Sequence, residues 1–275
     1  MQDITGKNSD SLKEKSLYLL DMDGTIYNEN EIFEGTLDFL REIRRRGGEY
    51  IFITNNSSRS VADYVEKVRA MGIQADYENF YTSSQATAMY IKENYPGQRV
   101  YCMGTRSLVE ELKQEGIDVV TEVDDKATVV LIGFDTENTS EKIRNTCIML
   151  GKDVAYLATN PDLVCPVSFG YIPDCGSMSI MLKNATGKEP FFIGKPEPIM
   201  VDCVLKKCKK KLVEAVIVGD RLYTDIKTGT RAGVDTICVL SGEASMEDIR
   251  QGEVKPDYIF QSVKEIYEGL TEDDR

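Results

Sequence analysis

Two aspartates stand where an apolar stretch of the chain ends, in a spacing suited to nucleophilic and acid–base chemistry. The stretch Leu17–Leu20 is followed at once by Asp21 and, two residues later, by Asp23. Side chains two residues apart on an extended chain point to the same side, so both carboxylates can serve one site. A carboxylate can attack an electrophile, move a proton or bind a metal ion. Gly24 allows the sharp turn that such a strand exit needs.

A second pair of acids follows another apolar stretch. Ala215–Val218 leads through Gly219 into Asp220, and Asp225 comes five residues later, where a helix is expected to begin. An aspartate at a helix start also serves as a cap, so Asp225 alone carries little information. Asp220 follows a buried strand directly, as Asp21 does. In open α/β sheets ligands bind at this end of the strands.

Two further expected strands end in groups that suit an anion. The strand 50–53 runs into hydroxyl and amide side chains: Thr54, Asn55, Asn56, Ser57 and Ser58. The strand 191–193 runs into Gly194 and Lys195. Hydroxyls, amides and backbone N–H groups can hold a phosphate, and a lysine can neutralise its charge.

Together, the four exits indicate phosphoryl chemistry with a metal ion. Converging carboxylates repel one another, and a hard divalent cation such as Mg²⁺ relieves that repulsion, most readily when a phosphate completes its shell. Asp21 can attack phosphorus to form an aspartyl-phosphate, while Asp23 protonates the leaving oxygen and later activates water. The chain contains no histidine, which excludes Ser-His-Asp triads, Cys-His pairs and HExxH zinc sites.

Composition limits the partners. The 275 residues carry 33 Lys and Arg against 46 Asp and Glu, a formal charge of −13, which disfavours nonspecific nucleic-acid binding. No apolar run approaches the roughly 18 residues that span a membrane, and residues 1–16 lack the apolar core of a signal peptide. The seven cysteines form no CxxC pair and lie mostly in apolar stretches, which indicates packed thiols. We therefore expect a cytoplasmic protein with no membrane or nucleic-acid partner.

The elements that must position these side chains alternate between strand and helix. Short apolar runs at 17–20, 50–53, 129–132, 154–157, 191–193 and 215–218 predict buried strands. Helices are expected over 36–46, over 60–71 after a Ser60 cap, and from about Pro198 to the basic run 206–211. This alternation predicts a doubly wound α/β fold with a parallel sheet.

The motifs in this order resemble those of the haloacid dehalogenase-like (HAD) hydrolase superfamily. Asp21 to Thr25 reads DMDGT, which is similar to the phosphatase pattern DxDGT, and Thr54, Lys195 and Asp220 follow in the order of the other three motifs. The resemblance implies a Rossmann-like core in which Asp21 is the nucleophile and Asp23 the acid/base. It also implies that Thr54, with Asn55 and Asn56, and Lys195 contact phosphate. The implied Mg²⁺ ligands are listed in chain order: Asp21, Asp23 through its backbone carbonyl, Asp220 and Asp225.

The long stretch between the second and third motifs resembles an inserted α/β cap. Segments 158–162 and 170–177 are similar to the cap of subclass IIA, which includes 4-nitrophenylphosphatase-like, phosphoglycolate and nucleotide phosphatases. We expect residues 1–82 and 189–275 to form the catalytic core and 83–188 the cap. Asn160, Asp162 and Asp174 are expected to face the substrate, with Asp174 disfavouring a second anionic group. A homodimer through the cap is also expected.

The predicted function is a Mg²⁺-dependent phosphomonoesterase for small phosphorylated metabolites, such as sugar phosphates or nucleoside monophosphates. Two alternatives remain open. A phospho-receiver or phosphate-binding module would use the same acids without turnover, although it is normally one small domain. A dehalogenase of the same fold would have no need of Asp23, because a halide leaves without protonation.

Overall fold

The computed structural model describes residues 1–167 and 169–272, and the chain divides into two compact units. The first unit comprises Met1–Ile53, Tyr64–Tyr81 and Lys195–Arg275. The second comprises Thr54–Asp63 and Thr82–Gly194. The second unit therefore includes the loop after Thr54 and extends to Gly194, whereas the sequence places the boundaries at residues 82/83 and 188/189.

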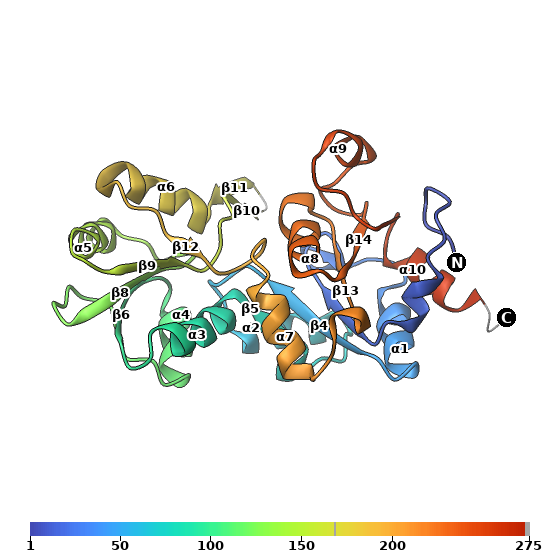
Figure 1. Cartoon of the computed structure of the whole chain (residues 1–275), viewed down its shortest axis with the longest axis horizontal. Helices are drawn as coiled ribbons and strands as arrows, with labels where there is room; N and C mark the ends of the chain where they lie inside the picture. The colour runs from blue at the N-terminus through green and yellow to red at the C-terminus, as the bar shows by residue number, and fades with distance from the viewer. Residues whose placement is uncertain (168, 273–275) are drawn as a thin grey trace. The chain divides into compact units, whose positions relative to one another are not determined.

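A six-stranded sheet forms the centre of the first unit (Figure 1). Its strands, in spatial order, are β15 (Tyr258–Phe260), β14 (Asp235–Val239), β13 (Ala215–Gly219), β1 (Leu17–Leu20), β4 (Glu49–Thr54) and β5 (Phe80–Thr82). Strand β1 pairs in parallel with β13 on one side and β4 on the other. In chain order this is the 3-2-1-4-5-6 arrangement, in which the order reverses between β1 and β13 and leaves a crevice at their carboxyl ends.

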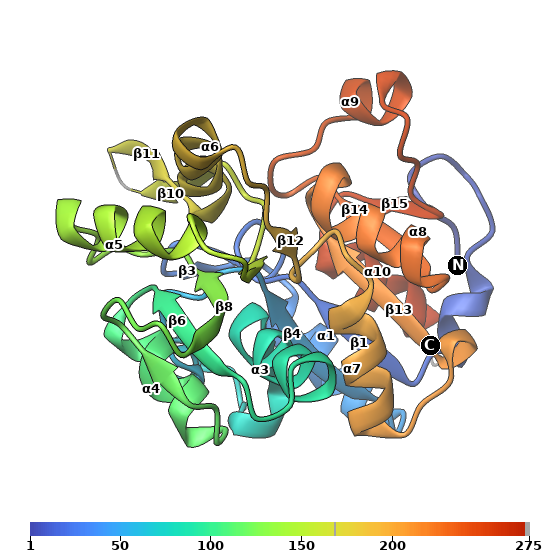
Figure 2. The same cartoon turned by 60° about the vertical axis from the view of Figure 1, so that its left-hand side comes forward.

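Helices cover both faces of this sheet, which explains why every residue of β1 and β13 is buried. Figure 2 shows α7 and α8 in front of the sheet and α10 behind it. Helix α1 packs against α10, and α7 packs against α8. The helices with residues in this unit are α1 (Thr36–Arg45), α2 (Val61–Ala70), α7 (Ile199–Cys208), α8 (Lys227–Ala232), α9 (Met246–Gln251) and α10 (Val263–Leu270).

Shorter elements complete the first unit. A hairpin of β2 (Tyr27–Asn28) and β3 (Glu31–Ile32) follows β1. Short stretches of 3₁₀ helix lie at Asp10–Glu14, Tyr77–Asn79 and Leu212–Glu214. A π-helical turn at Leu222–Ile226 leads into α8. Such turns are rare and often occur at functional sites, and this one contains Asp225.

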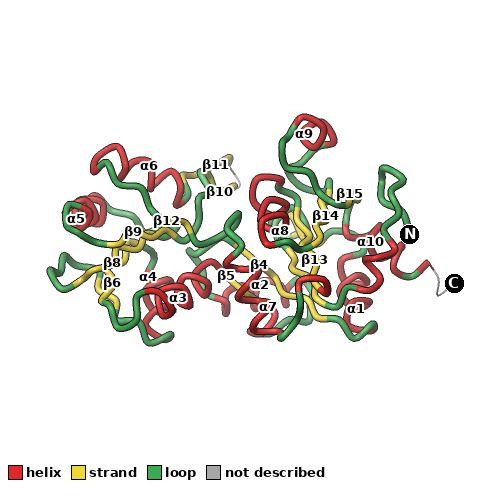
Figure 3. Tube along the Cα trace, in the orientation of Figure 1, coloured by secondary structure: helices red, strands yellow, loops and turns green. Residues whose placement is uncertain are grey.

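The second unit has its own parallel sheet of five strands. In spatial order they are β12 (Phe191–Phe192), β9 (Ala155–Ala158), β8 (Ala127–Ile132), β6 (Arg99–Met103) and β7 (Val119–Val120). Figure 3 shows α5 (Ser140–Leu150) and α6 (Cys175–Thr186) on one face, and α3 (Ser83–Asn94) and α4 (Arg106–Gln114) on the other. An antiparallel hairpin of β10 (Val164–Val167) and β11 (Gly170–Pro173) precedes α6.

The expected α/β class, a Rossmann-like parallel sheet with a further α/β unit, is confirmed. The six apolar runs of the sequence all contain strands, but one lies in a different sheet from the one expected. Strand β12 pairs with β9 in the five-stranded sheet, so Lys195 does not follow a strand of the sheet that carries Asp21. A two-residue strand gives no sequence signal for the sheet it joins, because that choice depends on nonlocal pairing.

The helices show no membrane-spanning candidate: within residues 1–167 and 169–272, none is both long and apolar enough to cross a bilayer.

Candidate active site

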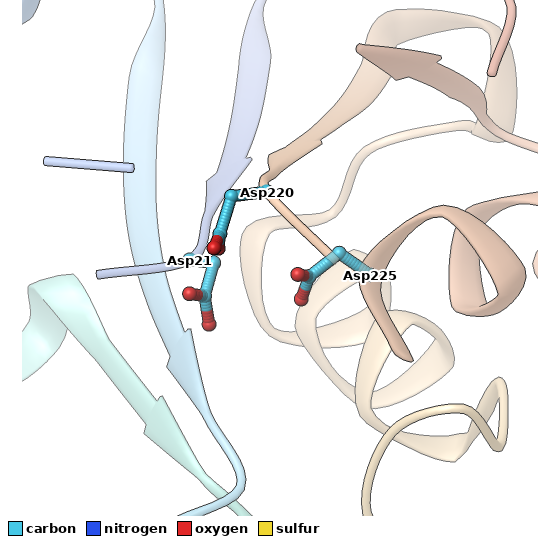
Figure 4. Close-up of side chains that lie close together, drawn as sticks. All are labelled: Asp21, Asp220 and Asp225. Atoms are coloured by element: carbon cyan, nitrogen blue, oxygen red, sulfur yellow. The ribbon is translucent and has the colours of Figure 1, made fainter. Parts of the chain in front are cut away.

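Three aspartates converge at the carboxyl end of the six-stranded sheet. One carboxylate oxygen from each of Asp21, Asp220 and Asp225 lies within 4.8 Å of the others. Figure 4 shows the three side chains close together, with Asp21 and Asp220 just after their strands and Asp225 on the turn that follows β13. Asp220 and Asp225 are buried, whereas the Asp21 side chain is 14% exposed. We call Asp21, Asp220, Asp225 and the adjacent Lys195 the carboxylate cluster.

The fold accounts for this convergence. Asp21 follows β1 and Asp220 follows β13, the two strands between which the strand order reverses. The backbone N–H of Asp21 still donates to the carbonyl of Val218, 2.9 Å away, so the parallel ladder continues into the site. Asp225 comes from the π-helical turn after β13, where the backbone N–H of Arg221 donates to its carboxylate at 3.2 Å.

Two glycines make room for the carboxylates. Gly24 has a φ of +88°, and a Cβ at this position would lie 2.3 Å from Oδ2 of Asp220. A Cβ on Gly219 would lie 2.3 Å from Cβ of Asp225. Any larger residue at either position would displace an acid of the carboxylate cluster.

Lys195 binds two of the three acids. Its ammonium donates to Oδ1 of Asp21 at 2.5 Å and to Oδ1 of Asp225 at 2.6 Å, and its side chain is only 4% exposed. The carbonyl of Ile53 accepts a third, longer hydrogen bond at 3.4 Å. The lysine therefore connects the residues after β1 and β13 even though it enters from the segment after β12.

The carboxylate cluster is electrostatically unbalanced. Burial and the charge of Asp225 raise the pKa of Asp21 well above its usual value, and Lys195 opposes that rise. Burial and Asp225 also raise the pKa of Asp220, to about 6. Burial alone would lower the pKa of Lys195, but Asp21 and Asp225 more than offset it and the pKa is raised. Such clustered acids with shifted pKa values are typical of catalytic and metal sites.

Asp220 has two hydrogen-bond partners that its position after a strand does not predict. The Thr25 hydroxyl donates to its Oδ1 at 3.4 Å, and the backbone N–H of Glu243 donates to its Oδ2 at 2.8 Å. Glu243 follows β14 closely, so the rule that located Asp21 and Asp220 would also have located this segment. The apolar run 236–240 predicts the strand after which Glu243 lies.

Asp23 lies outside the group of converging acids. Its carboxylate is 55% exposed, accepts a 3.4 Å hydrogen bond from the Tyr27 hydroxyl and lies 3.7 Å from the ammonium of Lys67. Lys67 also lies over the Tyr27 ring. Because the Asp23 carboxylate is exposed and has the Tyr27 hydroxyl and the Lys67 ammonium beside it, it is better suited to exchange protons with solvent or a leaving group than to bind a metal. Ligation through the Asp23 backbone carbonyl stays a prediction.

Three of the predicted phosphate-binding residues share one loop of the second unit. Thr54 ends β4, and its hydroxyl accepts the backbone N–H of Asn56 at 3.2 Å. The Asn56 side-chain oxygen accepts the N–H and hydroxyl of Ser58, at 2.9 and 2.7 Å. These bonds give the loop a fixed turn, and its contact with phosphate stays a prediction.

The remaining predicted residues, in the second unit, bind one another. Asn160 donates to Oδ2 of Asp162 at 2.9 Å and to Oδ1 of Asp174 at 3.0 Å. All three are buried, and Asp174 caps α6 by accepting the N–H of Cys175. Asn55 also donates to Asp162, at 2.6 Å. The structure thus brings together Asn55, Asn160, Asp162 and Asp174, and their contact with substrate stays a prediction.

Comparison with known proteins agrees with this geometry. The family model described as haloacid dehalogenase-like hydrolase matches residues 18–118, and the one described as HAD-hydrolase-like matches residues 192–266. The acid sugar phosphatase of Staphylococcus aureus is 35% identical over 254 residues, which cover 92% of this chain and 97% of that protein. The chain belongs to the haloacid dehalogenase-like hydrolase family. Relatives named as phosphatases, such as this acid sugar phosphatase, confirm the expectation of a phosphatase within this family.

Solved HAD hydrolases share the whole fold. The 4-nitrophenylphosphatase of Thermotoga maritima superposes with a TM-score of 0.90 at 36% identity, over 94% of this chain and 99% of that one. A glycerol phosphate phosphatase of Mycobacterium tuberculosis, solved in complex with magnesium, gives a TM-score of 0.87 at 28% identity, over 96% of this chain and 78% of that one. The predicted likeness to 4-nitrophenylphosphatase-type enzymes is thereby confirmed.

Proposed function

We propose that this HAD hydrolase is a Mg²⁺-dependent phosphomonoesterase that acts on small phosphorylated metabolites through an aspartyl-phosphate at Asp21. The observation that supports this most directly is the carboxylate cluster, in which three acids converge on one lysine that forms ion pairs with two of them. The magnesium complex of the related glycerol phosphate phosphatase supports the choice of metal.

The donor set fits Mg²⁺. Asp21, Asp220 and Asp225 offer carboxylate oxygens, the ligands that this cation prefers, and few protein ligands leave room for water and phosphate oxygens. Bound Mg²⁺ would offset the excess negative charge of the acids and polarise the phosphoryl group. Without the cation, burial and the neighbouring charge of Asp225 raise the pKa values of Asp21 and Asp220.

The chain's own residues can carry out both halves of the reaction. A carboxylate oxygen of Asp21 forms a bond to phosphorus while the ester P–O bond breaks, and Asp23 gives its proton to the departing alkoxide. Asp23 then takes a proton from the water that attacks the aspartyl-phosphate, which restores Asp21 and releases inorganic phosphate. Lys195 fixes the orientation of Asp21 through its 2.5 Å bond. The loop Thr54–Asn56 is proposed to bind the phosphoryl oxygens.

Phosphate release tests the proposal. We expect repeated turnover with Mg²⁺ on 4-nitrophenyl phosphate and, within a panel of sugar phosphates, glycerol phosphate, nucleoside monophosphates and phosphoglycolate, on at least one metabolite. One equivalent of bound phosphate without turnover would instead identify a receiver module. Release of halide from haloacids without phosphatase activity would identify a dehalogenase.

The cellular setting is a proposal of the same kind. All seven cysteines are thiols in the structure, four of them buried, which suits a reducing cytoplasm. Dimerisation through the second unit stays a prediction, supported by exposed apolar side chains on α5 and α6: Ile148, Ile180 and Met181. Light scattering of the purified chain would test it.

A further inference from the structure

Asn55, the residue after Thr54, turns its side chain into the second unit. Its amide nitrogen donates to Oδ2 of Asp162 at 2.6 Å, and both residues are more than nine-tenths buried. Its backbone carbonyl accepts the Ser83 hydroxyl at 2.7 Å. Its side-chain oxygen lies 2.6 Å from the position that a Cβ on Gly194 would occupy. The predicted phosphate-binding segment Thr54–Asn56 is therefore attached to the unit's interior through Asn55. The following residue, Ser57, adds a second attachment through its hydroxyl, which lies 3.0 Å from the Thr159 hydroxyl and accepts the N–H of Phe134 at 3.0 Å.

Asp162 is itself held firmly in place. The Oδ2 that accepts Asn55 also accepts the amide of Asn160 at 2.9 Å, and the Asp162 backbone carbonyl accepts the N–H of Gly176 at 2.8 Å. Asn160 is fixed in turn, because its side-chain oxygen accepts the Thr159 hydroxyl at 2.8 Å. Hydrogen bonds to a buried charged acceptor are stronger than those between neutral groups. We call Asn55, Thr159, Asn160, Asp162 and Asp174 the Asn55 network.

The Asn55 network contains or contacts residues that lie next to the unit boundaries in the sequence. The unit boundaries fall at Ile53/Thr54, Tyr81/Thr82 and Gly194/Lys195, among others. Asn55 and Ser83 each lie one residue inside such a boundary. Gly194, which precedes Lys195, donates its N–H to the carbonyl of Thr159 at 2.8 Å. The entry to the phosphate loop and the segment leading into Lys195 are thus fixed by the same buried contacts.

We propose that Asp162 is a positioning residue: through Asn55 it holds the loop Thr54–Asn56 in the conformation that binds the phosphoryl group. This inference rests on the proposed function. Because every substrate carries the phosphoryl group, a change at Asp162 should then lower kcat/KM by the same factor for all substrates. Contact of Asp162 with the leaving group, which the cap resemblance implies, would instead give an effect that differs from substrate to substrate.

The test compares Asp162→Ala, Asp162→Asn and Asn55→Ala with the wild type on several phosphate esters, with inorganic phosphate as the inhibitor. For Asp162→Ala we expect kcat/KM to fall about tenfold, the size of one lost charge-assisted hydrogen bond. The factor should be the same, within about twofold, for every ester, and the inhibition constant of phosphate should rise in parallel. Asp162→Asn keeps an acceptor oxygen and should recover most of the activity.

A double variant tests whether Asp162 acts through Asn55. If it does, Asn55→Ala/Asp162→Ala should fall no further than the worse single variant, because both remove the same interaction. Thr139→Ala is the control: it removes the cap of α5 in the same unit, far along the chain from the loop, and should lower the melting temperature without changing the inhibition constant.

Three results would overturn the proposal. One is a loss that differs from ester to ester at an unchanged phosphate inhibition constant, which would place Asp162 at the leaving group. Another is a lower melting temperature with unchanged kinetics, as for the Thr139 control. The third is full additivity in the double variant. Should Asp162→Ala fail to fold, Asn55→Ala removes the same hydrogen bond and carries the same comparison. A wild type without phosphatase activity would refute the proposed function alone, because calorimetric binding of inorganic phosphate still tests the loop.

Discussion

The carboxylate cluster of the first unit and the Asn55 network of the second are both buried polar groups, yet their charges are handled in opposite ways. In the carboxylate cluster three acids share one lysine, and the pKa values of Asp21 and Asp220 are raised. In the Asn55 network the carboxylate of Asp162 accepts two amide N–H groups of neutral asparagines. The first arrangement is costly until a cation or a substrate arrives, whereas the second is complete by itself.

The difference shows how a reactive site can be told from a supporting one. Aspartates and asparagines mark both regions in the sequence. A site that must bind a cation and a phosphate leaves charge uncompensated, because full compensation would remove the reason to bind. A site that must only hold a loop gains from complete hydrogen bonding, because each unpaired buried group weakens it. The predictions below probe this contrast, beginning with the largest effect.

The largest effect is expected for Asp21→Asn. The substitution preserves the size of the side chain and its place after β1 but removes the attacking carboxylate, so kcat should fall more than a hundredfold, or about 3 kcal/mol in the barrier. Phosphate release under saturating substrate measures this. Asp38→Asn, on the exposed surface of α1, is the matched control and should retain full activity. A residual kcat above about a tenth of the wild type would rule out Asp21 as the nucleophile.

The strand-exit residues of the carboxylate cluster could be predicted from the sequence because they depend on local pattern. Asp21 and Asp220 directly follow runs of apolar residues, and parallel strands end at one edge. Lys195 was expected at the same edge for a wrong reason, since β12 belongs to the other sheet. The asparagines and acids of the Asn55 network could not be assigned to the interior, because Asn55 and Asp162 are 107 residues apart and no local pattern records that pairing.

The next largest effect is expected on stability, from the buried acid Glu111, which belongs neither to the carboxylate cluster nor to the Asn55 network. Glu111, on α4, is 7% exposed, and burial raises its pKa to about 7 from an ordinary 4.5, with Ser84 opposing part of the rise. Because the folded state then holds the proton more tightly than the unfolded chain, Glu111 costs nothing below pH 4.5. Its cost grows as the pH rises to 7, up to about 3 kcal/mol.

Glu111→Gln stays neutral at every pH, so it should melt at a higher temperature than the wild type at pH 8 and at nearly the same temperature at pH 5. Thermal unfolding across this range measures the difference. Glu110→Gln, exposed on the same helix, should show no such trend. A stability difference between Glu111→Gln and the wild type that does not change with pH would contradict the assignment.

Metal binding should give a smaller shift. In the carboxylate cluster an added cation offsets uncompensated charge, so Mg²⁺ at ten times its dissociation constant should stabilise the wild type by about 1.4 kcal/mol, or roughly 3 °C. Asp220→Ala removes one ligand and should abolish the rise, whereas Asp162→Asn, in the Asn55 network, should leave it unchanged. A wild-type melting curve indifferent to millimolar Mg²⁺ would show that the cationic side chains beside the acids, Lys195 and Arg221, already balance them.

The smallest effect is expected at Asp174. A charge that selects substrates must face them, but Asp174 is 5% exposed and its Oδ1 accepts the amide of Asn160 at 3.0 Å and the N–H of Cys175. Asp174→Asn keeps an oxygen for these donors, so the ratio of kcat/KM for phosphoglycolate to that for 4-nitrophenyl phosphate should change less than about threefold, under 0.7 kcal/mol. Asp174→Gly, which removes the cap of α6 and also the acceptor of the Asn160 amide, should cost about 1 kcal/mol of stability, mostly through the lost Asn160 bond. If Asp174→Asn instead raised the ratio tenfold, the substrate would sense this buried charge. The Asn55 network would then select substrates as well as hold the loop. Asp174 would discriminate against a second anionic group even though its carboxylate is buried and hydrogen-bonded within the network.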